Sequence, residues 1–394
     1  MPRRDHPAPD EGARQPRPAS GERASLRETR HRPARVVLAR GVPAPERALV
    51  AFAGPLLDAR HGPAELVLDM GREIVGALAA QITVLRPAQM VVRYGEALCQ
   101  VLDPPAGQPA AADEVLARDT GPWVLRSSGR RAFRYVRLRV TQGSLSLENI
   151  WASHWERVAA RRGQFSSSDP LLNRIWTLCT DTLTVCTRET IEDAPARGPA
   201  ASAPVLRLAT LARQMAFGDV ACDVAAAGAA SAPAPHSGLA TAAACWAYWE
   251  ADRASDALAA VRAWWGGLLR EGAVTAWEAF DPAHAEEYVQ DPHLARCHAG
   301  STGPAYLLPR YVLGVAPATP GLAAVHLRPQ LGDLAWAQGL VPTPYGDVWV
   351  HWEAAPRLHG HVIVPAGLSA QVFWNVDDAA PALELGAGEH EIGL

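Results

Sequence analysis

The sequence predicts a multidomain protein of α and β structure, in which an N-terminal antiparallel β-sandwich and a C-terminal β-sandwich flank a helical middle. Alternating apolar and polar residues dominate residues 36–160, and this pattern returns in residues 316–394. Between them, apolar residues recur every three or four positions in residues 161–315, which is the helical period. At 394 residues the chain has room for about two to four domains of ordinary size.

Composition excludes several classes of protein. The net charge of −4 creates no field that would gather nucleic acid or anionic lipid. Residues 1–35 are rich in Arg and Pro and poor in large apolar side chains, so we expect them to be disordered and not to act as a secretory signal. No run of about 18 apolar residues predicts a membrane span. The six cysteines form no CxxC motif and are predicted to be buried free thiols, so a cytoplasmic location is expected.

The first predicted domain contains short strands separated by turn residues. Apolar and polar residues alternate in 65–69 and again in 133–140. Further strands are predicted over residues 77–85, 90–94 and 145–151, with Gly71, Gly76, Pro87 and Gly95 as the turn residues between them. Strands of this length and spacing are typical of an antiparallel sandwich.

The helical middle has a clear beginning. Asp169 precedes Pro170, which places a capping side chain before a proline, a favoured combination at a helix start. One apolar stripe then follows at Leu172, Ile175, Trp176, Cys179, Leu183 and Cys186. Further helices are predicted over residues 205–217, 239–250, 255–269 and 304–313. Residues 220–235, between the second and third helices, are nearly all Ala, Gly, Ser and Pro and are predicted to be a linker.

The C-terminal region returns to the strand period. Val348, Val350 and Trp352 alternate with polar or half-polar neighbours after a Pro-Tyr-Gly turn, and residues 361–364 and 371–373 continue the pattern. We therefore expect a second sandwich in residues 316–394.

Carboxylates close to aromatic residues are the remaining candidates for chemistry. The sequence has no GxGxxG opening a helix, no GxxxxGK[ST], no HExxH and no GxSxG, and its histidines lack metal-ligand spacing, so no cofactor or metal is expected. Glycoside cleavage needs one carboxylic acid and a second carboxylate, and aromatic faces bind sugars. Glu278 is the candidate carboxylate, beside Trp277 and shortly after Trp265.

Several longer motifs run through the chain in order. They occupy residues 69–76, 92–98, 131–138, 165–176, 264–267, 275–281, 297–298, 303–310, 327–333 and 341–347. In these motifs the chain resembles the bacterial α-L-rhamnosidases of glycoside hydrolase family 78, over nearly everything after residue 60. The resemblance implies a six-hairpin (α/α) barrel in the middle. Because the sequence pattern yields only about five helices, with the linker at 220–235 where most of the barrel would be, it implies a truncated barrel remnant.

The resemblance also implies a mechanism. The family inverts the sugar, which requires an acid and a base far enough apart to admit a water. By position in the motifs, Glu278 takes the role of the base, and Asp193 is a further catalytic residue. The acid position holds Gly198, or Pro199 under a longer variant of the motif. The resemblance therefore implies that this chain lacks the family's acid.

Other site positions are implied in the same way. Ser202, Val205 and Gly300 replace a Trp, an Asp and a favoured Trp of the family's motifs. Substrate-binding roles are implied for Arg197, Trp277, His298 and Trp265.

These residues leave three hypotheses for function. The first is an α-L-rhamnosidase-like hydrolase that removes terminal α-L-rhamnose, impaired at the acid position and relying on another acid such as Glu189 or Glu192. The alternative is a non-catalytic carbohydrate-binding or vestigial protein, and the third is a reading frame left by an internal deletion. The expected partner is a rhamnose-containing glycoside or oligosaccharide, with no nucleic acid and no membrane. Helices of an opened barrel would expose apolar stripes, which predicts self-association through exposed helical faces.

Overall fold

The structure is a computed structural model of the chain. It describes residues 26–52, 54–102, 114–198, 200–218, 236–319, 322–355, 357–373 and 383–393. The predicted linker at 220–235, Pro199, Cys222 and residues 1–25 lie outside the described residues.

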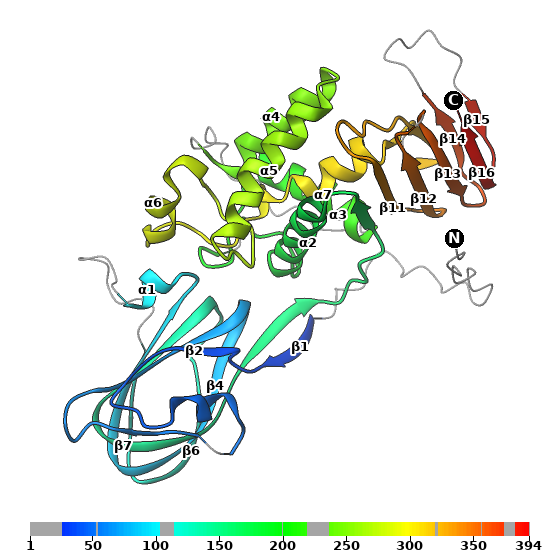
Figure 1. Cartoon of the computed structure of the whole chain (residues 1–394). Helices are drawn as coiled ribbons and strands as arrows, with labels where there is room; N and C mark the ends of the chain where they lie inside the picture. The colour runs from blue at the N-terminus through cyan, green and yellow to red at the C-terminus, as the bar shows by residue number, and fades with distance from the viewer. Residues whose placement is uncertain are drawn as a thin grey trace, which may run out of the picture.

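The N-terminal part is a seven-stranded sheet in which paired strands run antiparallel (Figure 1). Its path runs β1-β7-β4-β2, with β3 paired to β7 and with β5 and β6 paired to β4. The strands are β1 (Leu26–His31), β2 (Arg35–Arg40), β3 (Leu56–Asp58), β4 (Ala64–Gly95), β5 (Glu114–Arg118), β6 (Gly121–Arg126) and β7 (Arg131–Arg157), with a short 3₁₀ helix η1 (Pro45–Leu49) after β2.

Strands β4 and β7 are long because each contributes to both halves of the curled sheet. Tyr135 of β7 pairs with Asp69 near one end of β4 and with Gly95 at the other. The prediction of separate strands over 65–69, 77–85 and 90–94 is therefore wrong, since register shifts bend one continuous strand instead. At Gly76 an added Cβ would lie 1.7 Å from the Ser153 carbonyl oxygen, so this close approach of the two strands requires glycine.

The expected disorder of residues 1–35 needs correction at its C-terminal end. Residues 26–31 form β1, which pairs residue by residue with the last six positions of β7. Arg27 adds an ion pair to Glu156. The end of β7 offers an edge to which this polar stretch hydrogen-bonds, so backbone pairing orders it without a large apolar contribution.

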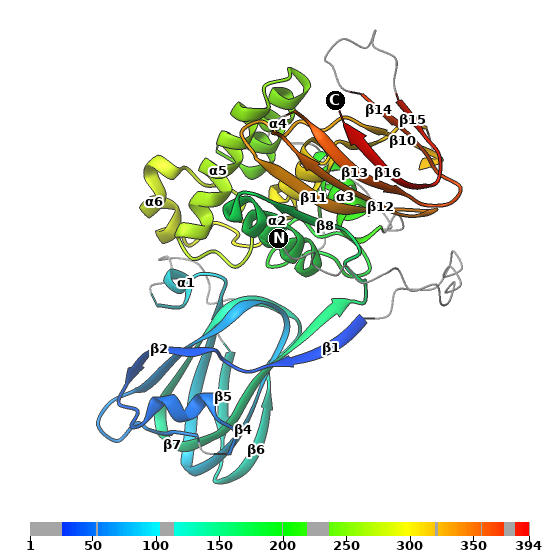
Figure 2. The same cartoon turned by 45° about the vertical axis from the view of Figure 1, so that its right-hand side comes forward.

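The helical part follows the predicted order closely (Figure 2). Its elements are α2 (Pro170–Val185), α3 (Ala203–Phe217), α4 (Gly238–Glu250), α5 (Ala254–Arg270), η2 (Pro282–His284), α6 (Ala285–Gln290), η3 (Ala299–Ser301), α7 (Pro304–Leu307) and the π-helical turn η4 (Leu308–Val312). Each of the predicted helices in this region is confirmed to within two residues at either end. The short α6, and α1 (Leu98–Leu102) after β4, have too few residues to show a period and were not predicted.

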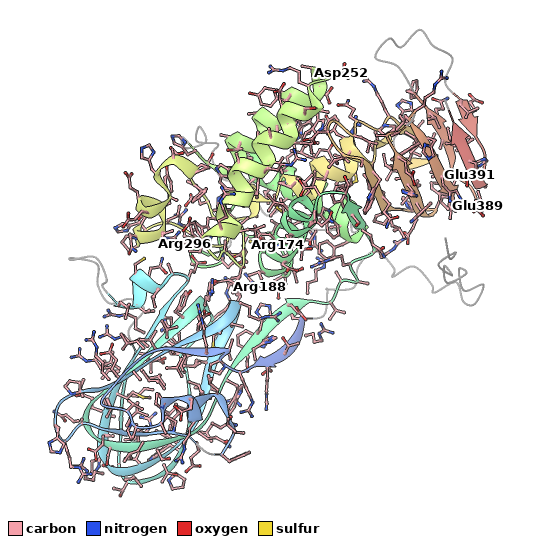
Figure 3. All side chains as sticks on the ribbon, in the orientation of Figure 1. Arg174, Arg188, Asp252, Arg296, Glu389 and Glu391 are labelled. Carbon is pink, nitrogen blue, oxygen red and sulfur yellow. The ribbon has the colours of Figure 1, made fainter. Side chains whose placement is uncertain are left out.

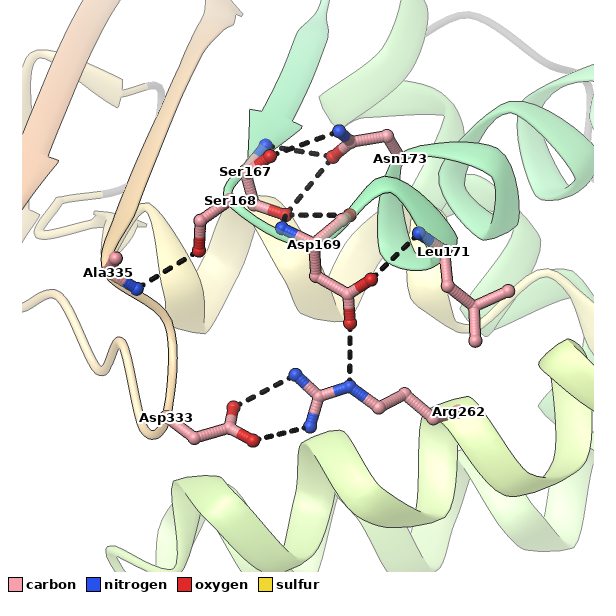
Figure 4. Close-up of polar contacts among 8 residues, drawn as sticks. All are labelled: Ser167, Ser168, Asp169, Leu171, Asn173, Arg262, Asp333 and Ala335. Carbon is pink, nitrogen blue, oxygen red and sulfur yellow. Dashed lines mark hydrogen bonds and ion pairs between the residues drawn. The ribbon is translucent and has the colours of Figure 1, made fainter.

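A polar network joins the start of α2 to the rest of the helical part (Figure 4). Asp169 caps α2 by accepting a hydrogen bond from the Leu171 amide at 2.8 Å. Its other carboxylate oxygen accepts one from Arg262 Nε of α5 at 2.7 Å. Arg262 also donates two hydrogen bonds to Asp333, at 2.7 and 2.9 Å. One guanidinium thus links α5 both to the start of α2 and to the segment before β11.

Replacing Arg262 with methionine should lower the free energy of unfolding by about 1–2 kcal/mol, because three charge-assisted hydrogen bonds are lost at a partly exposed site. The denaturation midpoint in urea measures this. Arg253→Met is the matched control, since Arg253 pairs with Asp256 and both side chains are more than half exposed. Equal midpoints for the two variants would contradict the assigned role of Arg262.

The C-terminal part contains two sheets. The five-stranded sheet has the order β16-β13-β12-β11-β8 and is antiparallel throughout; the four-stranded sheet has the order β15-β14-β10-β9, with β10 and β14 parallel. The strands are β8 (Gln164–Ser167), β9 (Val315–Pro317), β10 (Ala324–Leu327), β11 (Trp336–Thr343), β12 (Gly346–Glu353), β13 (His359–Val364), β14 (Ser369–Val372), β15 (Leu383–Leu385) and β16 (Gly388–Gly393).

The predicted boundaries at residues 161 and 316 do not separate two cores. Strand β8 precedes the helices in sequence but pairs with β11 in the C-terminal sheet. One continuous cluster of buried side chains runs from Phe165 through the helices to Ile392. The N-terminal sheet has a separate core, which includes Leu57, Leu66 and Phe133.

The expected exposure of apolar helical stripes is wrong for α2 and α5. Leu172, Ile175 and Leu183 of α2 are fully buried. Leu258, Val261, Trp265 and Leu268 of α5 are fully buried as well. Both stripes pack into the core that the helices share with the C-terminal sheets, which covers them in place of barrel neighbours. Self-association through other helical faces stays a prediction.

Candidate functional site

Three chain segments hold the predicted site residues: residues 187–198 after α2, residues 275–281 after α5, and residues 293–299 after α6. Backbone hydrogen bonds join them. The Glu278 amide donates to the Ala295 carbonyl at 3.0 Å, and the His298 amide donates to the Ala276 carbonyl at 2.9 Å. The Ala299 amide donates to the backbone carbonyl of Asp193 at 2.8 Å. The side chains of these segments are therefore positioned by ordered backbone.

Glu278 is held by Arg197. The two guanidinium nitrogens Nη1 and Nη2 donate to Oε1 and Oε2 of Glu278 at 2.8 and 2.6 Å, a bidentate ion pair. Burial pushes the pKa of Glu278 upward, but the Arg197 hydrogen bonds and charge, with His298 nearby, lower it below its ordinary value. The side chain retains 26% exposure. Glu278 is thus an ionised carboxylate that solvent can reach.

Asp193 and His298 form the second pair of the site. His298 Nε2 lies 2.7 Å from Asp193 Oδ1, and His298 Nδ1 lies 3.3 Å from the Ser301 hydroxyl. His298 is buried, whereas the Asp193 side chain is partly exposed. The structure therefore brings together four predicted residues, in the pairs Glu278–Arg197 and Asp193–His298, and His298 contributes to the electrostatic environment of Glu278.

The two predicted sugar-binding tryptophans are both buried. Trp265 is fully buried, donates its indole N–H to the Ser301 carbonyl at 2.7 Å, and packs against Trp264. Trp277 is 7% exposed, and the Arg296 guanidinium lies 4.1 Å from its ring centroid. Burial leaves Trp265 inside the core, whereas Trp277 lines a cavity between the N-terminal sheet and the helical part. Substrate binding by these rings therefore stays a prediction. The helical period of α5 directs Trp265 into the core, and Arg296 covers a face of Trp277.

Gly198, at the position of the family's acid, has free space around it. Gly198 has φ of +101°, and a Cβ built on it would meet no atom within 4 Å. Ser202 begins α3 as its N-cap residue, and Val205 is buried. None of Gly198, Ser202 and Val205 carries a carboxyl group.

Glu192 is not available as a replacement acid. It is buried and accepts hydrogen bonds from Arg130 Nη1 and Nη2, both at 2.8 Å, and it also forms an ion pair with the buried Arg188. Its two carboxylate oxygens are thus already engaged by two guanidinium groups. The other candidate, Glu189, is exposed.

Two buried carboxyls were missed by sequence reasoning. Glu73 and Glu96, both on β4 or directly after it, are 3% and 6% exposed. Both carboxyl oxygens of Glu73, and Oε1 of Glu96, have no hydrogen-bond partner among the described residues. They line a cavity of about 350 Å³ between the N-terminal sheet and the helical part, together with Arg134, Trp277 and Arg296. They are 23 residues apart in the sequence, and this spacing gave no signal that they would meet.

Glu278 does not line either of the two cavities beside the N-terminal sheet. A second space of about 670 Å³ is lined by Arg72, Glu73, Arg161 and Arg174 among others, and neither cavity includes Glu278 in its lining. Figure 3 places Arg174, Arg188 and Arg296 on the side of the helical part that faces the N-terminal sheet. No group of three or more His, Cys, Asp or Glu side chains that could hold a metal ion occurs in the part of the chain that the structure describes. The helices described are too short or too polar to cross a membrane.

Comparison with known proteins identifies relatives of the chain. The bacterial alpha-L-rhamnosidase C-terminal domain family matches residues 314–384. A curated alpha-L-rhamnosidase of Alteromonas sp. (strain LOR) is 30% identical over 113 residues, which cover 27% of this chain and 12% of that protein.

Solved structures extend the similarity to the fold. The GH78 family rhamnosidase of Bacillus sp. GL1 superposes with a TM-score of 0.69 at 18% identity, covering 85% of this chain and 56% of that one. The Klebsiella oxytoca rhamnosidase with rhamnose bound gives 0.60 at 16% identity, covering 73% and 96%. The Streptomyces avermitilis alpha-L-rhamnosidase complexed with L-rhamnose gives 0.61 at 13% identity, covering 94% and 54%.

The chain thus spans about half the length of two of these three structures. At these identities the superpositions show a shared fold, and the sequence matches are concentrated in the C-terminal part. Taken together, these comparisons show that the chain is similar to bacterial α-L-rhamnosidases, in the sequence of its C-terminal part and in its fold.

Proposed function

We propose that the chain is a glycoside hydrolase of the α-L-rhamnosidase type, acting by inversion on terminal α-L-rhamnose with Glu278 as the base, and that its catalysis is impaired. The observation that carries this proposal is the solvent-reachable Glu278 carboxylate, kept ionised by the bidentate Arg197 pair. A general base must be ionised and must have a free lone pair for the proton of the attacking water. Each oxygen of Glu278 accepts one hydrogen bond from Arg197 and keeps a lone pair for a water.

The Asp193–His298 pair supports the same proposal. The partly exposed Asp193 carboxylate, held by the buried His298, can accept hydrogen bonds from sugar hydroxyls. The rhamnose bound in the Klebsiella oxytoca and Streptomyces avermitilis structures supports rhamnose as the sugar recognised here. The cytoplasmic location stays a prediction.

The impairment follows from Gly198. Inversion requires a carboxylic acid to protonate the leaving oxygen while the base activates water. Gly198 has no side chain, and no atom beyond its own chain neighbours lies within 4 Å of where its Cβ would be. Protonation of the leaving group is therefore left to solvent. Losing one general acid typically costs about 10²–10⁴-fold in rate.

The purified chain should release phenol from an aryl α-L-rhamnoside slowly, and Glu278→Gln should lower that rate by about 10²-fold or more, because the amide cannot accept the proton of the attacking water. Glu287→Gln, at an exposed glutamate of α6, should leave the rate unchanged. Gly198→Glu, which restores the acid at the open position, should raise the rate, although its positive φ will reduce the gain.

Equal release by the parent chain and by Glu278→Gln would reject the proposal. That result would favour the alternative of a non-catalytic carbohydrate-binding or vestigial protein, which is motivated by the open acid position and by the covered rings of Trp265 and Trp277. Rhamnose binding that persists in Glu278→Gln without hydrolysis would distinguish a binding protein from a vestigial one.

A further inference from the structure

Two buried thiols meet beside the candidate site. The Sγ atoms of Cys186 and Cys297 lie 3.5 Å apart, although the residues are 111 positions apart in sequence. Both side chains are fully buried. Among the described cysteines, these are the two whose sulfur atoms are in contact. Cys99 and Cys179 instead contact backbone carbonyls, at Val289 and Ser301.

The backbone on either side of each thiol is ordered. Cys186 ends α2, where its amide donates to the Thr182 carbonyl at 2.8 Å and its own carbonyl accepts from the Glu192 amide at 2.8 Å. Cys297 lies between two anchored residues. The Arg296 amide donates to Glu96 Oε2 at 3.0 Å, and the His298 amide donates to Ala276 at 2.9 Å. The two sulfur atoms are therefore held facing one another by contacts that do not depend on the thiols themselves.

We propose that Cys186 and Cys297 form a redox modification site, a thiol pair that closes into a disulfide when the chain meets a disulfide oxidant such as oxidised glutathione. Bond formation requires the two sulfur atoms to approach from 3.5 Å to about 2.05 Å. Rotation of the two cysteine side chains toward each other supplies this displacement.

The exchange balances in two steps. One cysteine loses its proton and its thiolate attacks a sulfur of oxidised glutathione, which breaks the glutathione disulfide and releases one glutathione thiolate. The second cysteine thiolate then attacks the protein sulfur of the mixed disulfide and releases the other glutathione. The two cysteines together lose two protons and two electrons, and one oxidised glutathione becomes two reduced ones.

Burial makes this reaction slow in the native chain. Desolvation raises the pKa of the Cys297 thiol well above its ordinary value, with the adjacent Cys186 adding to the shift. Little thiolate is therefore present at neutral pH, and the oxidant reaches the sulfurs only through local opening. The rate of closure rises with pH, since a higher pH increases the thiolate fraction.

The bridge would tie two parts of the candidate site together. Cys186 leads into the segment that carries Asp193 and Arg197, and Cys297 is adjacent to His298. A disulfide here closes a long loop that contains α3, α4 and α5, and crosslinks over long loops restrict the unfolded chain most. We expect the oxidised chain to melt about 5–10 °C higher than the reduced chain.

The test compares native and refolded chain in a glutathione redox buffer at pH 8, followed by alkylation of free thiols and peptide mapping without reductant. The expected result is a crosslinked peptide containing Cys186 and Cys297, with a mass about 2 Da below the sum of the two thiol peptides. Crosslinking should be absent in Cys186→Ala and in Cys297→Ala. It should persist in Cys245→Ala, the matched control, because Cys245 is also fully buried.

Two results would overturn the proposal. The first is full alkylation of both cysteines after oxidative refolding, since refolding removes the access barrier. The second is a crosslink that joins either cysteine to a different one, such as Cys222, in place of the pair. Because thiol mapping does not require hydrolysis, the outcome is independent of the proposed rhamnosidase activity.

Discussion

Replacing Glu192 with alanine is expected to lower the free energy of unfolding by about 3–5 kcal/mol, the cost typical of removing one partner from a buried ion pair. Glu192 and Arg188 are both 3% exposed and form an ion pair. Arg130 adds a bidentate contact to the same carboxylate. Without Glu192, Arg188 would remain as a buried charge without its carboxylate. Desolvation already lowers the pKa of Arg188, so burial opposes its charge.

Chemical denaturation followed by tryptophan fluorescence measures this loss. Glu189→Ala is the matched control, because Glu189 is exposed and only three residues away; its stability should stay within about 0.5 kcal/mol of the parent chain. If the two variants denatured at the same urea concentration, the buried ion pair would not be a stabilising element.

Exchanging Glu96 for glutamine is expected to remove a loss of stability that the parent chain suffers as the pH rises. Burial raises the pKa of Glu96 from its ordinary value of 4.5 to about 7, and the charge of Glu278 adds to this rise. The hydrogen bond from the Arg296 amide and the charges of Arg197 and Arg296 oppose it. Burial also raises the pKa of Glu73 well above its ordinary value, and the charge of Glu96 adds to that rise.

Proton binding determines whether stability rises or falls with pH. The folded chain retains a proton on Glu96 that the unfolded chain releases, so this contribution is complete below pH 4.5 and is lost as the pH rises to about 7. The difference between the two pKa values corresponds to about 3 kcal/mol. Glutamine does not titrate and can still accept the hydrogen bond from the Arg296 amide. The Glu96→Gln variant should therefore keep its stability between pH 4.5 and about 7.

Urea midpoints measured from pH 5 to pH 8.5 test this expectation. Glu286→Gln, at an exposed glutamate, should reproduce the pH dependence of the parent chain. Glu96→Gln should give a flatter profile and should be the more stable chain at pH 8. Parallel profiles for the parent and Glu96→Gln would show that Glu96 does not titrate in this window.

The elements could be predicted from the sequence because their causes are local. The Asp169–Pro170 cap and the stripe that begins at Leu172 predicted α2, and the same period predicted α3, α4 and α5 to within two residues. Alternation predicted β12 and β13. It failed where one strand bends at bulges, because Gly71 and Gly76 have the appearance of turns in sequence while pairing continues through β4.

The candidate site was predictable only in part. The motifs indicated Glu278, Asp193, Arg197 and His298, and the structure places them in two adjacent pairs. The helical period of α5 places Trp265 on its buried stripe, but the burial of Trp277 was not predictable, because this residue lies in a loop without a period. The partner of Glu192 was not predictable either, because Arg130 comes from the segment before β7.

The sequence by itself determined the type and order of the elements and the presence of a carboxylate at Glu278, since periodicity, capping and motifs depend on residues close together in the chain. Only the tertiary structure decided which groups meet. It paired Glu278 with Arg197 across 81 positions and Cys186 with Cys297 across 111. It also buried Glu73, whose carboxyl oxygens have no hydrogen-bond partner among the described residues, and Glu96, whose Oε1 has none. Burial and long-range contact arise from packing of distant segments, and no local pattern encodes them.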